Sequence, residues 1–365
     1  MNIRHTRRNA FKHSVRLHTL RLAAMACGLV FSGAVAQAEQ PISLKIVGGL
    51  ASVSQYERLE KPFWEQGIER RSGGRITAEI HPYDRSGLPG PEMLQLMRLG
   101  VVPFGTALLA VVAGDEPELN VVDLPGLNPG MQALRKTVGV YRPRLEELLR
   151  TRFGIELLAI YSYPAQVIFC AKPFTGLSDL AGRKIRTSSV GQSEMMTALG
   201  AVPVITPFAE TVAAIRAGVV DCAITGTLSG NEIGLSDVTR SVYPMAISWG
   251  LSIFGANSAA WEALPRDLQG TLREQIKGLE QDIWTAAERE TSDGLACDTG
   301  GTRCPDGHHV SQMQLVPITR EDEALRRRLL VQSVLPGWIQ RCGAECTMLW
   351  NQTLAATTGI AVPAE

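Results

Sequence analysis

The sequence predicts an α/β fold, and the stretch 180–226 provides the clearest evidence for it. Short β-branched or apolar runs alternate there with helical segments of eight to ten residues, at 184–187, 193–200, 202–206, 209–218 and 219–225. Both helical segments end on a glycine, the residue that most readily closes a helix. Strands and helices that alternate in this way form parallel βαβ units with right-handed crossovers. We therefore expect a parallel sheet around this stretch.

Arg186 occupies a chemically informative position within the stretch. It lies at the carboxyl end of the first predicted strand, directly before a Thr-Ser-Ser run that can cap a helix. Ligands of parallel sheets bind beyond the carboxyl ends of the strands. A guanidinium can hold a carboxylate through two parallel hydrogen bonds, and the free N–H groups of a helix start add positive potential. The position suits an organic anion; the alternative is an exposed arginine that makes no specific contact.

The rest of the chain divides into elements of the same kinds. Strand-like or apolar runs lie at 42–50, 75–84, 101–113, 153–174 (divided at Tyr163-Pro164), 242–261 and 313–317. Predicted helices lie at 54–74, 89–100, 132–150 and from Pro265 to about Leu295, followed by two more that end near Thr358. The long helix carries an apolar stripe that predicts a core-facing side, at Leu268, Leu272, Ile276, Leu279 and Ile283.

Residues 1–38 are typical of a secretory signal peptide. Six basic residues and no acidic one precede an apolar core at 22–35, which is too short to span a bilayer. Small residues at 36–38 predict cleavage after Ala38, and the Arg7-Arg8 pair leaves both Sec and twin-arginine export open. We therefore expect an exported protein that is soluble after cleavage, and the family resemblance given below implies that it is periplasmic.

Charge and length narrow the possible functions. The formal net charge is +0, but removal of the leader leaves 30 basic against 36 acidic residues, a net charge of about −6. Such a charge does not favour nucleic acid or anionic lipid as a partner. About 327 residues remain, which is more than one hydrophobic core usually supports, so we expect two domains.

Six of the seven cysteines follow the leader, and export places them in an oxidising compartment. Cys297 and Cys304 bracket a glycine-containing loop, and Cys342 and Cys346 bracket a smaller one. Two local disulfides are the simplest interpretation, although pairing between the two loops stays open.

The other two exported cysteines, Cys170 and Cys222, lie in apolar strand-like runs and are either buried thiols or a third bridge. The alternative is a metal site, because His308 and His309 follow Cys304 closely. Their spacing matches no common zinc pattern, and export favours disulfides over thiolate ligands, so we expect no metal and no cofactor.

Nothing in the sequence favours an enzyme. Only three histidines follow the leader, and we find no G-x-S-x-G, P-loop, G-x-G-x-x-G or H-E-x-x-H motif. The hydroxyl groups of residues 187–189 are explained by helix capping. We therefore expect a protein without catalytic residues.

The order of several motifs resembles one family. The runs LAGRKIRTSS, ALGAVPVITPFAE and AIRAGVVDCAITG, preceded by SGGRITAEIHP and DLPGL and followed by AAWEALPRDLQ, are similar to the DctP-like solute-binding proteins of tripartite ATP-independent periplasmic (TRAP) transporters. The resemblance covers nearly the whole exported chain, and it is the order of the motifs that makes it specific.

This resemblance implies a two-lobed periplasmic binding protein fold, type II-like, with a long helix that spans both lobes. We expect residues 42–164 and about 251–290 in one lobe, and residues 165–250 and about 291–365 in the other. The family's carboxylate-binding arginine falls on Arg186. The implied function is a monomeric receptor that delivers a small organic acid to TRAP permease subunits; the alternative is a periplasmic sensor or scaffold with the same fold.

Five further positions follow from the resemblance as ligand contacts. Ser189 either faces the ligand or caps a helix, and Phe208 and Trp249 either line the pocket or pack in the core. Gln166 stands where some members, notably sialic-acid binders, carry a second arginine, and Thr225 stands where many carry asparagine. The missing second arginine argues against sialic acid and leaves the class of carboxylate broad.

Overall fold

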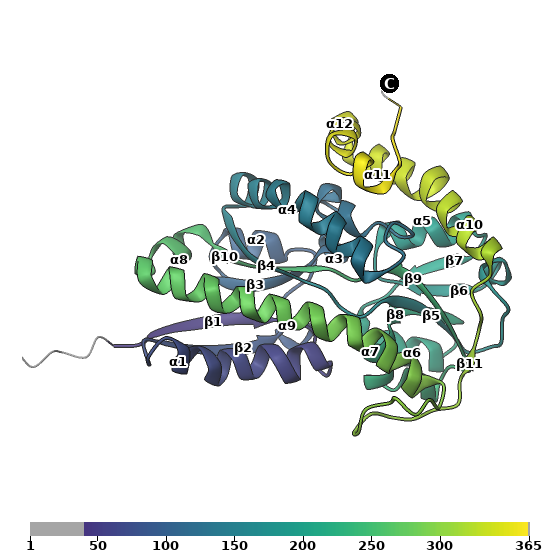
Figure 1. Ribbon diagram of the computed structural model, residues 1–365, viewed down its shortest axis with the longest axis horizontal. Coiled ribbons are helices and arrows are strands. Elements are labelled where there is room, and N and C mark those ends of the chain that lie inside the picture. Colours follow the sequence, from purple (N-terminus) through teal and green to yellow (C-terminus); the bar gives the residue numbers. More distant parts are fainter. Residues whose placement is uncertain (1–39, 364–365) are drawn as a thin grey trace, which may run out of the picture. The chain divides into compact units, whose positions relative to one another are not determined.

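The computed structural model describes residues 40–363, and two β-sheets form its framework (Figure 1). The predicted leader and its cleavage site therefore lie outside the described residues. The first sheet has the strand order β2 (Ile76–Pro82), β1 (Ile42–Gly48), β3 (Phe104–Leu108), β10 (Ser252–Asn257), β4 (Ile155–Tyr161). The second has the order β11 (Gln314–Leu315), β9 (Ser241–Ser248), β5 (Gln166–Cys170), β8 (Cys222–Gly226), β6 (Lys184–Thr187), β7 (Val202–Ile205).

The central stretch folds as predicted. Strands β6, β7 and β8 are parallel neighbours, and the helices α5 (Val190–Ala198) and α6 (Thr211–Arg216) connect them. The register places Arg186 opposite Val204 on one side and Ala223 on the other. The prediction of parallel βαβ units is therefore confirmed.

Short connections bring the carboxyl ends of the two sheets together. In the first sheet β1, β2 and β3 are parallel, and β10 is antiparallel to both β3 and β4, so β4 points the same way as β3. In the second sheet β5 is antiparallel to β8 and β9. Residues 162–165 lead from the end of β4 to β5, and residues 249–251 lead from the end of β9 to β10. The carboxyl edges of both sheets therefore meet at these two crossing segments.

The predicted long helix is α9 (Arg266–Asp298), and it packs on elements of both sheets (Figure 1). All five residues of the predicted stripe are buried, which confirms its core-facing side. On the first sheet, the indole of Trp284 donates to the carbonyl oxygen of Ile160 in β4, 2.7 Å away. Towards the second sheet, Gly294 lies so close to α7 (Thr227–Glu232) that a Cβ there would be 2.2 Å from the Leu228 nitrogen.

The remaining helices differ in detail from the predicted pattern. The predicted helix 54–74 is divided into two π-helical segments, η1 (Gln55–Glu60) and η2 (Phe63–Gly67), and the short α-helix α1 (Ile68–Arg71). Two final helical regions were predicted, and the first is continuous: α10 (Arg320–Leu329), the π-helical η8 (Leu330–Val334) and α11 (Leu335–Cys342) follow one another without a break. The second contains α12 (Ala344–Thr353) and α13 (Ala355–Thr358). A break after Cys342, where Gly343 has φ +93, separates α11 from α12. The others are α2 (Met93–Arg98), α3 (Leu109–Val112), α4 (Met131–Phe153) and α8 (Ser258–Glu262).

All six cysteines of the described chain form disulfides. Bonds join Cys297 to Cys304 and Cys342 to Cys346 within their local loops. A third bond joins two facing strand residues, Cys170 of β5 and Cys222 of β8. Within residues 40–363, no helix is long and apolar enough to cross a membrane.

Candidate functional site

Arg186 lies at the carboxyl edge of the second sheet and is almost completely buried. The strand β6 places it between β7 and β8, so its side chain can reach both neighbouring chains. Its Nε donates to the carbonyl oxygen of Thr206, 2.9 Å away, and its Nη1 donates to the carbonyl oxygen of Ile224, 2.7 Å away. These two bonds hold the guanidinium in a fixed orientation.

The charge of Arg186 has no acidic partner among the described residues. Its hydrogen bonds go to neutral carbonyl groups, and burial lowers its pKa to about 10, so the guanidinium stays protonated at neutral pH. A buried charge without a counter-ion is costly, and an anion that binds beside it removes that cost. The site is therefore electrostatically prepared for an anion.

Ser189 is the N-cap of α5. Its hydroxyl oxygen accepts the backbone N–H of Gln192 at 3.1 Å, so the capping alternative describes what its side chain does here. Gln192 itself was not predicted as a site residue. Its Oε1 accepts the N–H of Ser188 at 2.8 Å, and its Nε2 donates to the hydroxyl of Ser248, 2.9 Å away. The sequence signal was the S-x-x-Q spacing of a capping box.

The strand register separates the other predicted contacts. Arg186 pairs with Ala223, and Thr225 follows two residues later in β8, so Arg186 and Thr225 share one face of the sheet. Gln166 pairs with Gly226, which places it on the opposite face, and its Nε2 donates to the carbonyl oxygen of Pro164 at 3.1 Å. The structure thus places Thr225 on the same face of the sheet as Arg186 and Gln166 on the opposite face.

The two predicted aromatic contacts lie in different surroundings. Phe208 begins a short 3-10 turn after β7 and is half-buried against the core. Trp249 is buried in the crossing segment 249–251, where its indole N–H donates to the carbonyl oxygen of Asn128, 3.0 Å away. Core packing therefore accounts for Trp249 without a ligand.

A loop at the carboxyl end of β1 forms the corresponding rim of the first sheet, and sequence reasoning missed its supports. The N–H of Gly49 donates to the carboxylate of Glu60 at 2.8 Å, and the N–H of Leu50 donates to the hydroxyl of Tyr163 at 3.2 Å. Ser52 follows with φ +60, a left-handed conformation that non-glycine residues seldom adopt. Burial raises the pKa of Glu60 to about 7, against the opposing effect of its hydrogen bonds.

One contact joins this rim to the second sheet's helices. The backbone N–H of Ser54 lies 3.1 Å from both carboxylate oxygens of Glu232 at the end of α7, and the Ser54 hydroxyl donates to the same carboxylate. Burial raises the pKa of Glu232, whereas the Ser54 hydrogen bonds lower it. The contact links two segments 178 residues apart in the sequence.

A second buried carboxylate binds a crossing segment. Asp123 accepts hydrogen bonds from the backbone N–H groups of Trp249 at 2.7 Å, Gly250 at 2.8 Å and Leu251 at 3.4 Å. Burial raises the pKa of Asp123 to about 7, and these three bonds oppose the shift.

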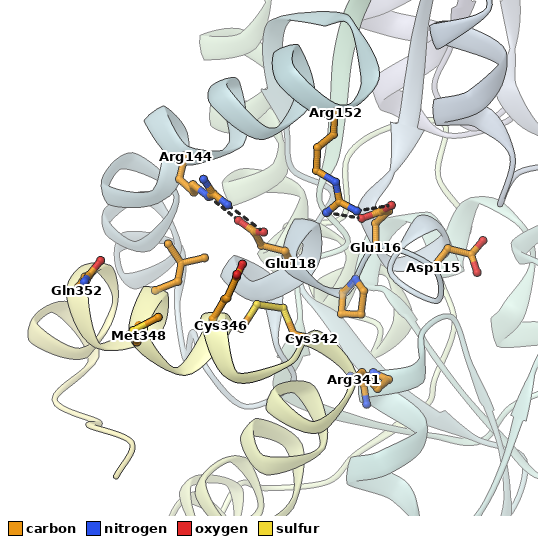
Figure 2. Close-up of a pocket in the computed structure, with 13 residues that line it drawn as sticks. Asp115, Glu116, Glu118, Arg144, Arg152, Arg341, Cys342, Cys346, Met348 and Gln352 are labelled. Carbon is orange, nitrogen blue, oxygen red and sulfur yellow. Dashed lines mark hydrogen bonds and ion pairs between the residues drawn. A yellow bond between two sulfur atoms is a disulfide. The ribbon is translucent and has the colours of Figure 1, made fainter. Parts of the chain in front are cut away.

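A cavity of about 470 Å³ lies away from these residues, between η4 (Pro117–Asp123), α4 and the helices α11 and α12 (Figure 2). Figure 2 shows Arg144 and Arg152 directed at Glu118 and Glu116, with nitrogen–oxygen distances of 2.6 and 3.0 Å. The Cys342–Cys346 disulfide lines the opposite wall. None of the predicted ligand contacts lines this cavity. Arg144 and Arg152 are paired with Glu118 and Glu116, and the third lining arginine, Arg341, forms an ion pair with Glu194.

Comparison with known proteins identifies the class of protein. Residues 50–296, more than half of the chain, match the family described as "Bacterial extracellular solute-binding protein, family 7" (DctP). The chain belongs to this family, which is a family of periplasmic receptors and not of enzymes, so the recognition made from the motifs is confirmed.

Curated relatives agree with this assignment. The chain is 27% identical over 280 residues to a "Solute-binding protein" of Albidiferax ferrireducens, an alignment that covers 74% of this chain and 81% of that protein. It is 26% identical over 290 residues to the "C4-dicarboxylate-binding periplasmic protein DctP" of Rhodobacter capsulatus, covering 77% and 82%.

Solved structures show the same two-lobed fold. DctP7 of Bordetella pertussis, described as binding pyroglutamic acid, matches with a TM-score of 0.71 at 22% identity, over 84% of this chain and 98% of that chain. A TRAP solute-binding protein of Rhodoferax ferrireducens with bound malonate matches with a TM-score of 0.71 at 22% identity, over 86% and 98%. The predicted fold class, with two lobes and a long spanning helix, is confirmed.

Proposed function

We propose that the protein captures a small organic acid in the periplasm through a salt bridge to Arg186 and delivers it to a TRAP-type membrane permease. The observation that carries the proposal is the buried guanidinium of Arg186, which is held by two carbonyl groups and has no acidic partner within residues 40–363. A carboxylate supplies the counter-charge, and exclusion of water strengthens the attraction between them.

The ligands of similar structures support an anion of this size. Pyroglutamate and malonate are named for the two structures above, and L-malate for a TRAP protein of Pseudomonas aeruginosa. Each ligand carries at least one carboxylate. At these low sequence identities the structural similarity shows a shared fold alone. The acid that this protein binds must therefore be determined by experiment.

The binding site is proposed to lie between the carboxyl edges of the two sheets. Arg186, Ser189, Phe208 and Thr225 would contribute from the second sheet, with Gln166 at the start of β5 and Trp249 in the crossing segment 249–251. The strands that make up each sheet support the proposed lobes, which are residues 42–164 with about 251–290 and residues 165–250 with about 291–365. The Ser54–Glu232 contact would then form when the lobes close. A ligand shifts the protein towards this closed state if it binds the closed state better than the open one.

Calorimetry on the exported chain tests the salt bridge, with pyroglutamate, malonate and L-malate as probes. Arg186→Ala should weaken binding by about 2–5 kcal/mol, because it removes the charged partner of a buried carboxylate. Arg183→Ala is the matched control, since Arg183 also donates to backbone carbonyl groups but lies at the opposite end of β6. Unchanged affinity in Arg186→Ala, or no stabilisation of the wild-type protein by a wide panel of carboxylates, would refute the proposal.

Delivery to a permease requires a separate test. The gene should lie beside genes for two membrane permease subunits, and its deletion together with theirs should abolish uptake of the acid that the purified protein binds. An isolated gene next to a regulator, with uptake unaffected, would favour a sensor.

A further inference from the structure

The two crossing segments between the sheets are held by different kinds of group. In the segment 162–165, the N–H of Ala165 donates to the hydroxyl of Thr291 in α9, 3.0 Å away, and no charged side chain of residues 40–363 bonds to this segment. In the segment 249–251, the carboxylate of Asp123 accepts three consecutive backbone N–H groups. Among the described residues, a carboxylate therefore supports the second crossing and not the first.

The segment 249–251 is also constrained in its conformation. Gly250 has φ +67, and a Cβ at this position would lie 3.1 Å from the side-chain nitrogen of Gln166. The neighbouring loop pairs with the end of β9, because the N–H of Gly126 donates to the carbonyl oxygen of Ile247 at 2.8 Å. Asp123 thus completes a set of contacts that leaves this crossing little freedom.

The isolation of Asp123 distinguishes it from an ordinary ion pair. Its side chain is buried, and within residues 40–363 its partners are the three N–H groups, with no arginine or lysine paired to it. An unpaired buried carboxylate is costly, yet an apolar residue in its place would leave three buried donors without acceptors. The carboxylate is therefore suited to one conformation of the crossing segment.

We propose that Asp123 is a positioning residue for ligand binding, which holds residues 249–251 in the conformation that sets the separation of the two carboxyl edges. The effect on affinity rests on the proposed function, whereas the effect on the separation of the sheets does not. Loss of the carboxylate would let the crossing segment sample other conformations, and the two edges would then meet less often in the arrangement that encloses a ligand.

Distance measurements on the unliganded exported chain test the proposal directly. Spin labels are attached through Lys45→Cys in β1 and Lys184→Cys in β6, two exposed strand residues of different sheets. Asp123→Asn should broaden the distribution of label separations. Asp123→Asn should also weaken ligand affinity at least tenfold, through faster dissociation. The ligand in this measurement is whichever of pyroglutamate, malonate and L-malate the wild type binds.

Two further variants make the result decisive. Asp298→Asn is the matched control, because Asp298 is also a buried carboxylate and accepts from Asn231 at 3.0 Å at the end of α9; it should leave the distance distribution unchanged. Gly250→Ala should broaden the distribution by an independent route, and it serves if Asp123→Asn does not fold. Wild-type distributions in both crossing variants would overturn the proposal. If Arg186→Ala loses affinity but keeps the wild-type distribution of label separations, the result concerns the salt bridge alone and not the role of Asp123.

Discussion

The two edges that meet at the crossing segments carry buried charges of opposite sign, and they use them differently. On the second sheet, Arg186 makes bonds to two neutral carbonyl groups and lacks a counter-ion among the described residues. On the first sheet's rim and at the crossing, Glu60 and Asp123 are acidic and already hold backbone N–H groups. The comparison teaches that one edge holds a buried charge whose bonds go only to neutral carbonyl groups among the described residues, whereas the carboxylates of the other edge fix their own backbone.

Removal of Glu60 should have the largest effect on stability. Glu60→Ala leaves the donors of Gly49 and Gln55 without an acceptor in a buried site, at a cost of roughly 2–4 kcal/mol in the free energy of unfolding. Chemical denaturation measures this cost. Glu57→Ala, an exposed position in the same segment, is the control and should change stability by less than about 0.5 kcal/mol. Equal effects of the two substitutions would show that Glu60 does not support the rim.

The Ser54–Glu232 contact should affect binding more than folding. Glu232→Gln removes a charged acceptor for Ser54, and hydrogen bonds to charged groups contribute about 1.5–3 kcal/mol, so ligand affinity should fall by roughly tenfold or more. A double-mutant cycle with Ser54→Ala measures the coupling. Strictly additive effects of the two substitutions would contradict a contact that helps the edges to close.

Stability should fall as the pH rises through neutrality. Burial raises the pKa values of Glu60, Asp123, Glu290 and Asp298 to about 7, so the folded state binds protons that the unfolded state has already lost. This contribution is fully present below the unfolded pKa and is lost as the pH passes the folded pKa. The free energy of unfolding should decrease by up to about 1.4 kcal/mol per pH unit for each carboxyl between pH 5 and 7. A flat profile there would contradict the burial of these charges.

The parts of the fold that depend on local pattern could be predicted from the sequence. The alternation of β-branched runs and glycine-ended helices predicted β6, α5, β7, α6 and β8, and the apolar stripe predicted the buried face of α9. The place of Arg186 at the carboxyl end of β6 could be predicted because it depends only on where one strand ends, and its role in binding stays a prediction. These signals lie within a few residues of each other.

The contacts that shape the site could not be predicted, because their partners are far apart in the sequence. Asp123 and Trp249 are 126 residues apart, and Ser54 and Glu232 are 178 apart. No local spacing distinguishes such carboxylates from surface ones. The division of the apolar run 242–261 at Gly250 was also missed, because the crossing depends on the left-handed conformation of that residue and on its partner Asp123.

The packing of α9 has a mechanical consequence. Its earlier part is fixed to the first sheet by Trp284, whereas Gly294 lies against the backbone of α7, which belongs with the second sheet. Ten residues separate these two anchor points, which is roughly 15 Å of helix. Any change in the angle between the sheets must therefore bend those turns or shear one anchor. The elastic energy of bending α9 would then contribute to the free-energy difference between open and closed forms.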